Sequence, residues 1–407
     1  MQTTSANGQG ISKRLLLLLI VTGHSATHWY AGMLSALLPW IREDLGLSYA
    51  QIGLLMSSRA LLATCGNLIT GIAADMGGHR RSILIASVVM MAVCYIMIGM
   101  STALWMLLVF GSLAAMASNA WHPPAMSMLG ESYPDRRGYA LGWHGTGAHL
   151  GETLGPLAVG AMLSFLSWRA ALYANVWPGL AMGVVLLWLL PVLGHDRLVR
   201  ETKGYWDELK TGLVFNASLM KVAVLSILRT SGEQGLKTFL PLYLAEMLDF
   251  SPALVGLGIA VMTFSGSWVQ PLSGLLSDRI GRKPVLFVSL LLSAFVAWDL
   301  TVAHGILLPI LFISLIGALH LSLRSIILAF AMDVTPPEIG ASTIGFVFSA
   351  NQFFSALMPI MTGYLADIYG LRIAFLMFAV LTLLAALWVP LMSASREDTS
   401  LPHAQQA

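Results

Sequence analysis

Charged residues are scarce in this 407-residue chain: Lys, Arg, Asp and Glu make up 10% of it, whereas soluble domains contain about 25%. Hydrophobic residues make up 57%, whereas apolar residues make up about 45–50% of a typical soluble domain. The composition therefore excludes an ordinary soluble protein. We expect lipid to surround most of the chain.

Residues that support catalysis or disulfide formation are also scarce. The chain contains two cysteines, Cys65 and Cys94, in separate apolar stretches without the spacing of a metal site, so we expect both to be buried small hydrophobic residues. It contains no nucleophile motif, no phosphate-binding loop and no His-Glu-x-x-His metal site. We therefore predict that the chain is not an enzyme and has neither a cofactor nor a metal centre.

Apolar runs of about 20 residues recur between short polar loops, and this is the length that an α-helix needs to cross a bilayer. The sequence predicts an all-α membrane protein with twelve transmembrane helices in two six-helix bundles. The predicted helices cover residues 15–40, 50–74, 82–101, 104–131, 138–166, 170–193, 221–245, 252–276, 284–303, 306–331, 340–366 and 372–393.

The two halves of the chain resemble each other. Asp75 in GIAADMGGHRR and Asp278 in GLLSDRIGRKP lie 203 residues apart (278 − 75) and end similar apolar stretches. An internal repeat of this length indicates two pseudo-symmetric bundles. The same offset of 203 relates Pro156, Gly160 and Arg169 to Pro359, Gly363 and Arg372.

The domain boundaries follow from the repeat and from the charge pattern. We predict an N-terminal bundle over residues 1–193, a cytoplasmic linker over 194–220, a C-terminal bundle over 221–393 and a disordered tail over 394–407. Fifteen Lys and Arg residues lie at the helix ends on the side of the termini, and three lie at the opposite ends. The positive-inside rule therefore predicts cytoplasmic termini in a cytoplasmic (inner) membrane.

Apart from residues near the helix ends, six charged residues fall inside the predicted helices. A charge at the bilayer centre costs about 2.5–3.5 kcal/mol, so such residues are expected to face a wet cavity or a partner. None of them lies in the third, sixth, ninth or twelfth helix, so the polar side chains cluster on a subset of helices. The six are Arg59, Glu152, Arg229, Glu233, Lys237 and Arg324.

The loops after the second and eighth helices share the pattern Gly-x-x-x-Asp-x-x-Gly-x-[Arg/Lys], although Met76 and His79 replace usual basic residues in the first copy. With twelve spans in two duplicated halves, this pattern resembles the major facilitator superfamily. The resemblance implies a central cavity lined mainly by the first, fourth, seventh and tenth helices. It also implies a gating role for the loops, with a role in folding and topology alone as the alternative. The expected gating residues are Gly71, Asp75, Gly78 and Arg80 in the first copy and Gly274, Asp278, Arg279, Gly281, Arg282 and Lys283 in the second.

The fifth helix contains GWHGTGAHLGETLGPLAVG (142–160), which resembles the signature of drug/proton antiporters except that one valine replaces a glycine. Glycine lets a neighbouring helix approach, and proline kinks the helix. We therefore place Gly151, Gly155 and Pro156 among the gating residues, with ordinary helix packing as the alternative. The antiporter-like motif favours export. Two other stretches, LSYAQIGLL (47–55) and LVFGSLAAMASNAWHPPA (108–125) with its WHPP break, are similar to the fosmidomycin-resistance branch of the superfamily, whose members are regarded as exporters.

Arg229, Glu233 and Lys237 lie four residues apart in the seventh helix, so they share one helical face. We expect Glu233 to pair with a basic neighbour and to release it on protonation, which would make it a proton carrier. We expect Glu152 to be a second proton site that shares its proton with His149, three residues earlier on the same side of the fifth helix. The alternatives are a static ion pair at Glu233 and a permanently protonated Glu152.

Four cations minus two carboxylates leave +2 among the intramembrane charges, which suits an anionic or zwitterionic substrate because guanidinium pairs with carboxylate and phosphate groups. Alternatively, each arginine joins the two halves. Aromatic and amide side chains are expected to add contacts to an organic substrate, with packing or an interface belt as their alternative role. The predicted substrate-binding residues are Arg59, Arg229, Lys237, Arg324, His28, His122, Trp29, Tyr30, Trp121, Trp143, Asn351 and Gln352.

The sequence thus predicts a proton-coupled secondary active transporter that exports a small amphipathic or anionic organic compound by alternating access. Its expected partners are the substrate, protons and the lipid bilayer, not nucleic acid, and we expect a monomer. The first alternative is a proton symporter that imports an organic anion. The second is a transporter of a metal or metal chelate, because His24 and His28 share one face of the first helix and His122, His144 and His149 could approach them.

Overall fold

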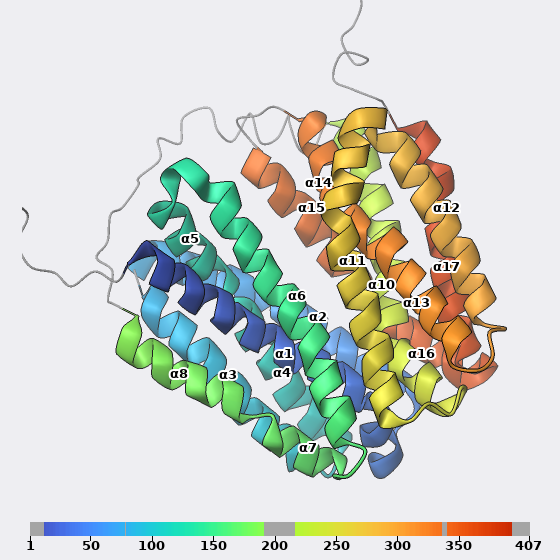
Figure 1. The fold of residues 1–407 in the computed structure, drawn as a ribbon, viewed down its shortest axis with the longest axis horizontal. Coiled ribbons are helices and arrows are strands. Elements are labelled where there is room, and N and C mark those ends of the chain that lie inside the picture. Colours follow the sequence, from blue (N-terminus) through green and yellow to red (C-terminus); the bar gives the residue numbers. More distant parts are fainter. Residues whose placement is uncertain (1–11, 78, 191–215, 336–339, 393–407) are drawn as a thin grey trace, which may run out of the picture.

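The computed structural model describes residues 12–77, 79–190, 216–335 and 340–392. The predicted linker, apart from its C-terminal end, and the predicted tail lie outside these ranges, as does Gly78. Helices make up nearly all of the described residues, which contain no β-strand, and they form two bundles side by side (Figure 1).

The N-terminal bundle contains six membrane spans, two of which are broken. The fourth span consists of α4 and α5, and the sixth consists of α7 and α8. The helices are α1 (Lys13–Leu45), α2 (Tyr49–Gly77), α3 (Arg80–Gly99), α4 (Leu104–Ala120), α5 (His122–Ser132), α6 (Arg137–Met162), α7 (Trp168–Ala174) and α8 (Trp177–Leu189).

The C-terminal bundle repeats this arrangement with breaks in its fourth and fifth spans, which are the tenth and eleventh of the chain. A short 3-10 helix, η3 (Leu321–Leu323), separates α13 from α14, and α15 is followed by α16. The helices are α10 (Ala217–Glu246), α11 (Pro252–Ile280), α12 (Arg282–Leu300), α13 (Leu307–His320), α14 (Arg324–Asp333), α15 (Gly340–Ser355), α16 (Met358–Tyr369) and α17 (Arg372–Trp388). The prediction of twelve transmembrane helices in two pseudo-symmetric six-helix bundles is confirmed.

Eight helical stretches of the described residues are long and apolar enough to cross a membrane by length and composition. The four remaining long helices, α1, α2, α6 and α10, contain most of the ionisable residues that the sequence places inside the bilayer. A polar stripe lowers the hydropathy of a span, so these are the helices expected to line a wet cavity. The helices α3, α8, α12 and α17 lie at the outer edges of the two bundles (Figure 1), where the sequence predicts apolar spans.

The break in the fourth span has a local cause. Pro123 and Pro124 lack a backbone N–H and cannot continue α4, but they fit the first turn of a new helix. The helix therefore restarts as α5 at His122, directly after Trp121. This change of direction places the side chain of His122 on the inner side of the bundle, next to α1.

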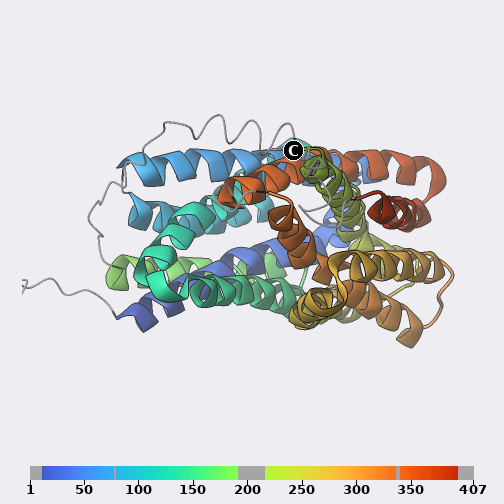
Figure 2. The same cartoon turned by 90° about the horizontal axis from the view of Figure 1, so that it is seen from above.

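The two bundles contact each other closely at the end of the molecule that contains Arg42, which we call the Arg42 face. The helices α6 and α11 converge toward this face, at the bottom of Figure 1 near α7 and α16, and Figure 2 shows the two bundles from above. A Cβ atom added at Gly256 of α11 would lie 2.3 Å from the carbonyl oxygen of Pro156 of α6. Glycine is therefore required at position 256 for this approach.

Polar contacts fasten the same face. The guanidinium of Arg42 donates to Glu246 across the bundles at 3.2 Å. The carboxylate of Asp367 accepts hydrogen bonds from the backbone N–H groups of Tyr49 (2.8 Å) and Ala50 (2.9 Å), at the start of α2. One bundle thus caps a helix of the other, because the first N–H groups of a helix have no partner within it.

One prediction on the cysteines is wrong. Cys94 is buried as expected, but Cys65 is exposed on the surface of the protein. An apolar span has a lipid-facing side as well as a core-facing side, and the composition of the stretch around residue 65 does not distinguish them.

Candidate substrate and proton site

A cavity of about 670 Å³ lies between the two bundles and is lined by residues of both. All six of the charged residues that the sequence places inside the membrane line it. The predicted site residues in its wall are Arg59, Arg229, Lys237, Arg324, Glu152, Glu233, His28, His122, His149, Asn351 and Gln352.

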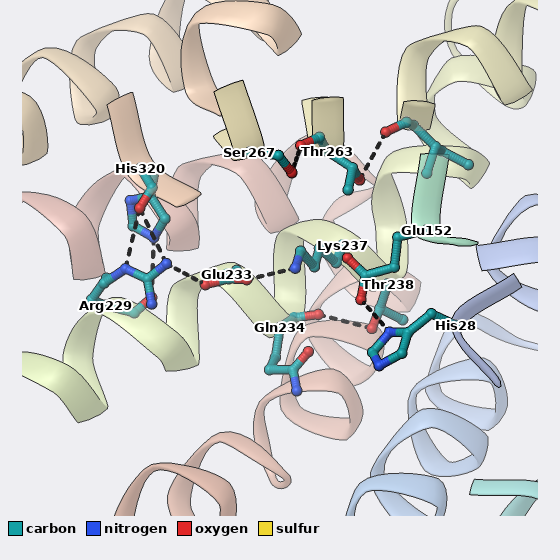
Figure 3. Close-up of polar contacts among 11 residues, drawn as sticks. His28, Glu152, Arg229, Glu233, Gln234, Lys237, Thr238, Thr263, Ser267 and His320 are labelled. Carbon is teal, nitrogen blue, oxygen red and sulfur yellow. Dashed lines mark hydrogen bonds and ion pairs between the residues drawn. The ribbon is translucent and has the colours of Figure 1, made fainter. Parts of the chain in front are cut away.

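The three charged residues of α10 form one connected ion-pair chain (Figure 3). One carboxylate oxygen of Glu233 lies 2.7 Å from the guanidinium of Arg229, and the other lies 2.6 Å from Nζ of Lys237. The side chain of Glu233 is 14% exposed and that of Arg229 is 4% exposed, whereas that of Lys237 is 35% exposed. The guanidinium of Arg229 also donates to the backbone carbonyl of His320 at 3.1 and 3.3 Å. Glu233 therefore holds two cations at once.

Glu152 of α6 pairs with a residue that the sequence does not connect to it. Its Oε1 lies 2.9 Å from Nδ1 of His28 on α1 (Figure 3). The predicted partner, His149, also lines the cavity, but its Nδ1 is buried without a hydrogen-bond partner among the described residues. Glu152 thus pairs with α1, and no hydrogen bond joins it to His149 among the described residues.

The other two cations differ in how firmly they are held. Arg59 of α2 is buried and donates to the carbonyl of Gly111 at 2.8 Å. Arg324, the first residue of α14, is exposed within the cavity wall, and its guanidinium lies 4.9 Å from the ring of Phe348. Because no ion pair of Arg324 is found among the described residues, it is the cation with most freedom to bind an anion.

The two amide side chains of α15 already have partners. Asn351 donates to Oγ of Ser226 on α10 at 2.8 Å, and Gln352 donates to the carbonyl of Ala60 on α2 at 3.2 Å. The second bond crosses between the bundles. Both residues line the cavity, so they remain candidates for substrate contact.

Four predicted aromatic residues lie outside the lining of the cavity, and each has another contact. Trp29 donates to Asn175 at 3.2 Å, and the fully buried Tyr30 donates to the carbonyl of Val176 at 2.5 Å. Trp121 is fully buried in the N-terminal core, and Trp143 is 46% exposed. Trp29, Tyr30 and Trp121 thus pack within the N-terminal bundle, and a substrate role for all four residues stays a prediction.

The loop motifs lie at the end opposite the Arg42 face. In the second copy, Arg282 pairs with Asp278 and lies 3.1 Å from Asp333 at the end of α14. In the first copy, Arg80 lies 2.6 Å from Glu131 at the end of α5. The pairs Arg80–Glu131 and Arg282–Asp333 each span 51 residues, and they lie 202 residues apart (282 − 80), whereas the motif offset of 203 aligns Arg80 with Lys283.

Glu131 and Asp333 contact the loop motifs, and they are site candidates that sequence reasoning missed. Gly281 has φ +93°, a backbone conformation that favours glycine, and it links α11 to α12. Arg279 is exposed, Lys283 is half-buried, and Gly274 has open space around it. Gly71 and Asp75 lie in the last turns of α2, whose side chains are outside the described part of the chain.

The glycines of α6 bring this helix against α1. A Cβ at Gly151 would lie 2.1 Å from the carbonyl oxygen of Ser25, and one at Gly155 would lie 2.4 Å from that of Trp29. Pro156 then meets α11 of the other bundle, as described above. The glycine and proline motif of α6, the fifth membrane span, therefore lies at the interface between the bundles. Its gating role stays a prediction.

Further polar residues of the cavity wall were not predicted to bind the organic substrate or the proton. His24 and His144 line it beside His28 and His122, and Thr230 and Gln234 line it from α10. The spacing of Thr230 and Gln234, one position after Arg229 and Glu233, is a signal that the sequence contains.

Comparisons with known proteins agree with this architecture. Residues 20–230 and 222–406 each match the Major Facilitator Superfamily. The chain is 23% identical over 352 residues to a "Probable 4-methylmuconolactone transporter" of Cupriavidus pinatubonensis, covering 83% of this chain and 80% of that protein. It is 24% identical over 389 residues to the "Multidrug resistance protein MdtG" of Klebsiella pneumoniae, covering 90% and 84%.

Two solved structures have the same fold. A bacterial homologue of the human lysosomal transporter Spinster, in an inward-facing and unoccupied conformation, matches with a TM-score of 0.83 at 17% identity, covering 97% of this chain and 100% of that chain. A mutant of the nucleoside transporter NupG matches with a TM-score of 0.79 at 16% identity, covering 94% and 100%. The twelve-helix fold, the duplicated halves and the matches over both halves show that this chain belongs to the major facilitator superfamily.

Proposed function

We propose that this chain is a proton-coupled secondary active transporter of a small organic anion, and that Glu233 carries the proton. The single observation that supports this most directly is that four cations and two carboxylates line one cavity between the bundles. Membership of the superfamily supports secondary transport by alternating access, with the cavity exposed to one side of the membrane at a time.

The charge of the cavity favours an anion. Arg59, Arg229, Lys237 and Arg324 contribute +4 and the two glutamates contribute −2, which leaves +2. Arg324 is free to form paired hydrogen bonds with a carboxylate, phosphonate or sulfonate group. The apolar and methionine residues of the wall provide contacts for an organic body. A small amphipathic anion fits both features.

The geometry of α10 predicts whether the proton and the anion favour or oppose each other's binding. An anion that binds Arg229 or Lys237 draws these cations away from Glu233, and the freed carboxylate in a poorly hydrated site then accepts a proton more readily. By reciprocity, a proton on Glu233 strengthens the binding of the anion. Proton and anion therefore bind together and move in the same direction, which is symport.

We assign the proton to Glu233 rather than to Glu152. Neutralising Glu233 releases two permanent cations toward the cavity, whereas Glu152 is bonded to a histidine. Neutralising Glu152 raises the net charge of the cavity by the same amount, but it releases no permanent cation to bind the substrate.

Export by proton antiport is the second candidate. It is favoured by the antiporter-like motif of α6 and by the multidrug resistance proteins among the relatives. Antiport requires a substrate that competes with the proton, so it would need a cationic group that takes the place of Arg229 or Lys237 beside Glu233. The two candidates thus differ in the charge of the group that contacts Glu233.

The orientation of the transporter completes the proposal. We place both termini in the cytoplasm, because the basic residues concentrate at that end of the helices. The Arg42 face is then the outer face, and its bonds between bundles support a state that is closed to the outside.

Substrate binding by purified protein tests the proposed function. We would measure the melting temperature against aromatic carboxylates, phosphonates, sulfonates and lipophilic cations, each at pH 6 and pH 8. Symport predicts that an anion stabilises the protein more strongly at pH 6, and that Glu233→Gln removes the difference between the two pH values. Stabilisation by cations alone, stronger at pH 8, would support antiport and contradict the proposal.

A further inference from the structure

Four histidines of the N-terminal bundle meet at one place in the cavity wall. His24 and His28 come from α1, His122 from the start of α5 and His144 from α6. The Nε2 atoms of His24 and His122 lie 3.2 Å apart, and the rings of His24 and His144 stack with their centroids 3.6 Å apart. The ring nitrogens that His24, His28 and His122 offer all lie within 4.8 Å of one another.

The hydrogen bonds of three of these rings fix where their protons lie. Nδ1 of His24 lies 2.6 Å from the backbone carbonyl of His144, and Nδ1 of His28 lies 2.9 Å from the carboxylate of Glu152. Nδ1 of His122 lies 3.3 Å from the backbone carbonyl of Asn119. A carbonyl and a carboxylate only accept, so each Nδ1 must carry the proton and donate it. Each Nε2 then has a free lone pair.

Three nitrogen lone pairs that lie close together repel one another unless a proton or a cation lies between them. Those of His24 and His122 are at hydrogen-bond distance but have no proton to share, and Nε2 of His28 is buried without a hydrogen-bond partner among the described residues. One extra proton between His24 and His122 would satisfy that pair and leave His28 unsatisfied. A metal ion satisfies all three.

We propose that His24, His28 and His122 bind one divalent transition-metal ion through their Nε2 atoms, with a fourth coordination position open to the cavity. A tetrahedral zinc site with Zn–N bonds of about 2.0–2.1 Å separates its ligand nitrogens by roughly 3.3–3.4 Å. The pair His24–His122, at 3.2 Å, already has this spacing. One ring nitrogen of each of the three histidines lies within 4.8 Å of those of the other two, so a ring shift of about 1.5 Å brings the third ligand to this spacing.

The surroundings match those of known histidine metal sites. Metal-bound histidines usually donate their other ring N–H to a carboxylate or a backbone carbonyl, which fixes the ring and raises its basicity. Here Glu152 serves His28, and two backbone carbonyls serve His24 and His122. Imidazole ligands suit Zn²⁺, Ni²⁺ and Cu²⁺, whereas Mg²⁺ and Ca²⁺ prefer oxygen ligands.

The open position has a use in the proposed transport cycle. An anionic oxygen of the substrate coordinates the metal on the N-terminal bundle, while its other end meets Arg324 and Lys237 on the C-terminal bundle. The substrate would then bridge the two bundles. This extension rests on the proposed function, whereas the metal site itself rests only on the histidines.

Metal binding can be measured without any transport assay. We would titrate tag-free purified protein with Zn²⁺ by calorimetry and with Co²⁺ by visible absorption, and use Mg²⁺ as the negative control. We expect one Zn²⁺ per chain and a Co²⁺ spectrum typical of low-coordinate nitrogen ligation. The variants His28→Ala and His122→Ala should each weaken Zn²⁺ binding by at least about 100-fold, and Glu152→Gln by about 10–100-fold.

The matched control is His149→Ala, which removes an imidazole from the same cavity but not from the triad. It should bind Zn²⁺ within about threefold of the unmodified chain. Absence of a stoichiometric Zn²⁺ site in the unmodified, folded protein would overturn the proposal, as would binding that survives His122→Ala or is lost in His149→Ala. Whether a Zn²⁺ site exists is decided on the unmodified protein, so that result does not depend on whether a variant folds. A negative result here leaves the proton and anion measurements above unaffected.

Discussion

The substitution Glu233→Gln tests the coupling that we derive from α10. The amide keeps the size of the side chain but loses the negative charge that lies 2.7 Å from Arg229 and 2.6 Å from Lys237. The net charge of the cavity rises from +2 to +3, as it does when Glu233 is protonated. The variant therefore imitates the protonated state permanently.

The size of the cavity sets the expected gain in anion affinity. A sphere of about 670 Å³ has a radius of roughly 5.4 Å, which is the distance from its wall to a ligand at its centre. Removing one unit charge at that distance changes the binding free energy of a monovalent anion by about 1–3 kcal/mol, for effective dielectric constants between about 80 and 20. The anion should therefore bind about 5-fold to 140-fold more tightly to Glu233→Gln.

The same change should lower the stability of the protein. Arg229 is almost completely buried, and breaking a buried ion pair by removing one partner costs about 3–5 kcal/mol. Arg229 keeps its two bonds to the carbonyl of His320, so we expect a loss near the lower end of that range. The ligand-free variant should melt at a lower temperature than the unmodified chain. Because the anion binds the variant more tightly, it should raise the melting temperature of the variant more than that of the unmodified chain.

Calorimetric titration with the anion that stabilises the protein best, at pH 8, measures the affinity. Proteoliposomes that contain a pH-sensitive dye measure proton movement, which the variant should have lost. Glu43→Gln is the matched control, because it removes a carboxylate that is exposed, lies outside the cavity lining and forms no ion pair among the described residues. Weaker anion binding in Glu233→Gln, or undiminished proton movement, would refute the coupling.

Three further substitutions test other parts of the account. Arg324→Ala should weaken anion binding by about 10–100-fold, which corresponds to the loss of one charge-assisted hydrogen bond. Because no ion pair of Arg324 among the described residues is lost, the free energy of unfolding should change by less than about 0.5 kcal/mol in a melting assay. Gly256→Ala should force α6 and α11 apart and raise thiol labelling of cysteines introduced at the Arg42 face, whereas Gly142→Ala, with open space around it, should not. Asp367→Ala removes the cap on α2, worth about 1–2 kcal/mol, and should shift the population that is open at the Arg42 face by about 5–30-fold in the same labelling assay.

Each of these has a result that would count against it. A large loss of stability in Arg324→Ala would mean that this arginine joins the bundles instead of binding substrate. Equal labelling of Gly256→Ala and Gly142→Ala would show that the α6–α11 contact does not close the Arg42 face. Unchanged labelling in Asp367→Ala would show that the cap on α2 does not help to close the Arg42 face.

The architecture could be predicted because it depends on patterns that the sequence contains directly. Spans of about 20 apolar residues give the number of helices, and the 203-residue repeat gives the two bundles. The high cost of a charge in lipid explains why Arg59 and the other five charged residues predicted inside the membrane all line the cavity. The spacing of four residues likewise gave the contacts around Glu233, since they lie within one helix.

Contacts between helices could not be predicted in the same way. The partner of Glu152 is His28, 124 residues away, and finding it requires the relative rotation and height of α1 and α6. The same is true of Trp121, whose place in the core depends on the direction of the break before α5. Glu131 and Asp333 were missed for a different reason: they lie outside the loop motif, in the helix that the motif contacts.

The direction of proton movement is the most direct test of the central claim that proton and anion move together. Proteoliposomes with a pH-sensitive dye inside would receive an aromatic sulfonate or phosphonate outside, because these probes stay ionised and do not cross the bilayer as neutral acids. Symport predicts that the lumen becomes more acidic only when the protein is present, and that Glu233→Gln abolishes this signal while Glu43→Gln keeps it. An interior that becomes more alkaline would show antiport and contradict the account.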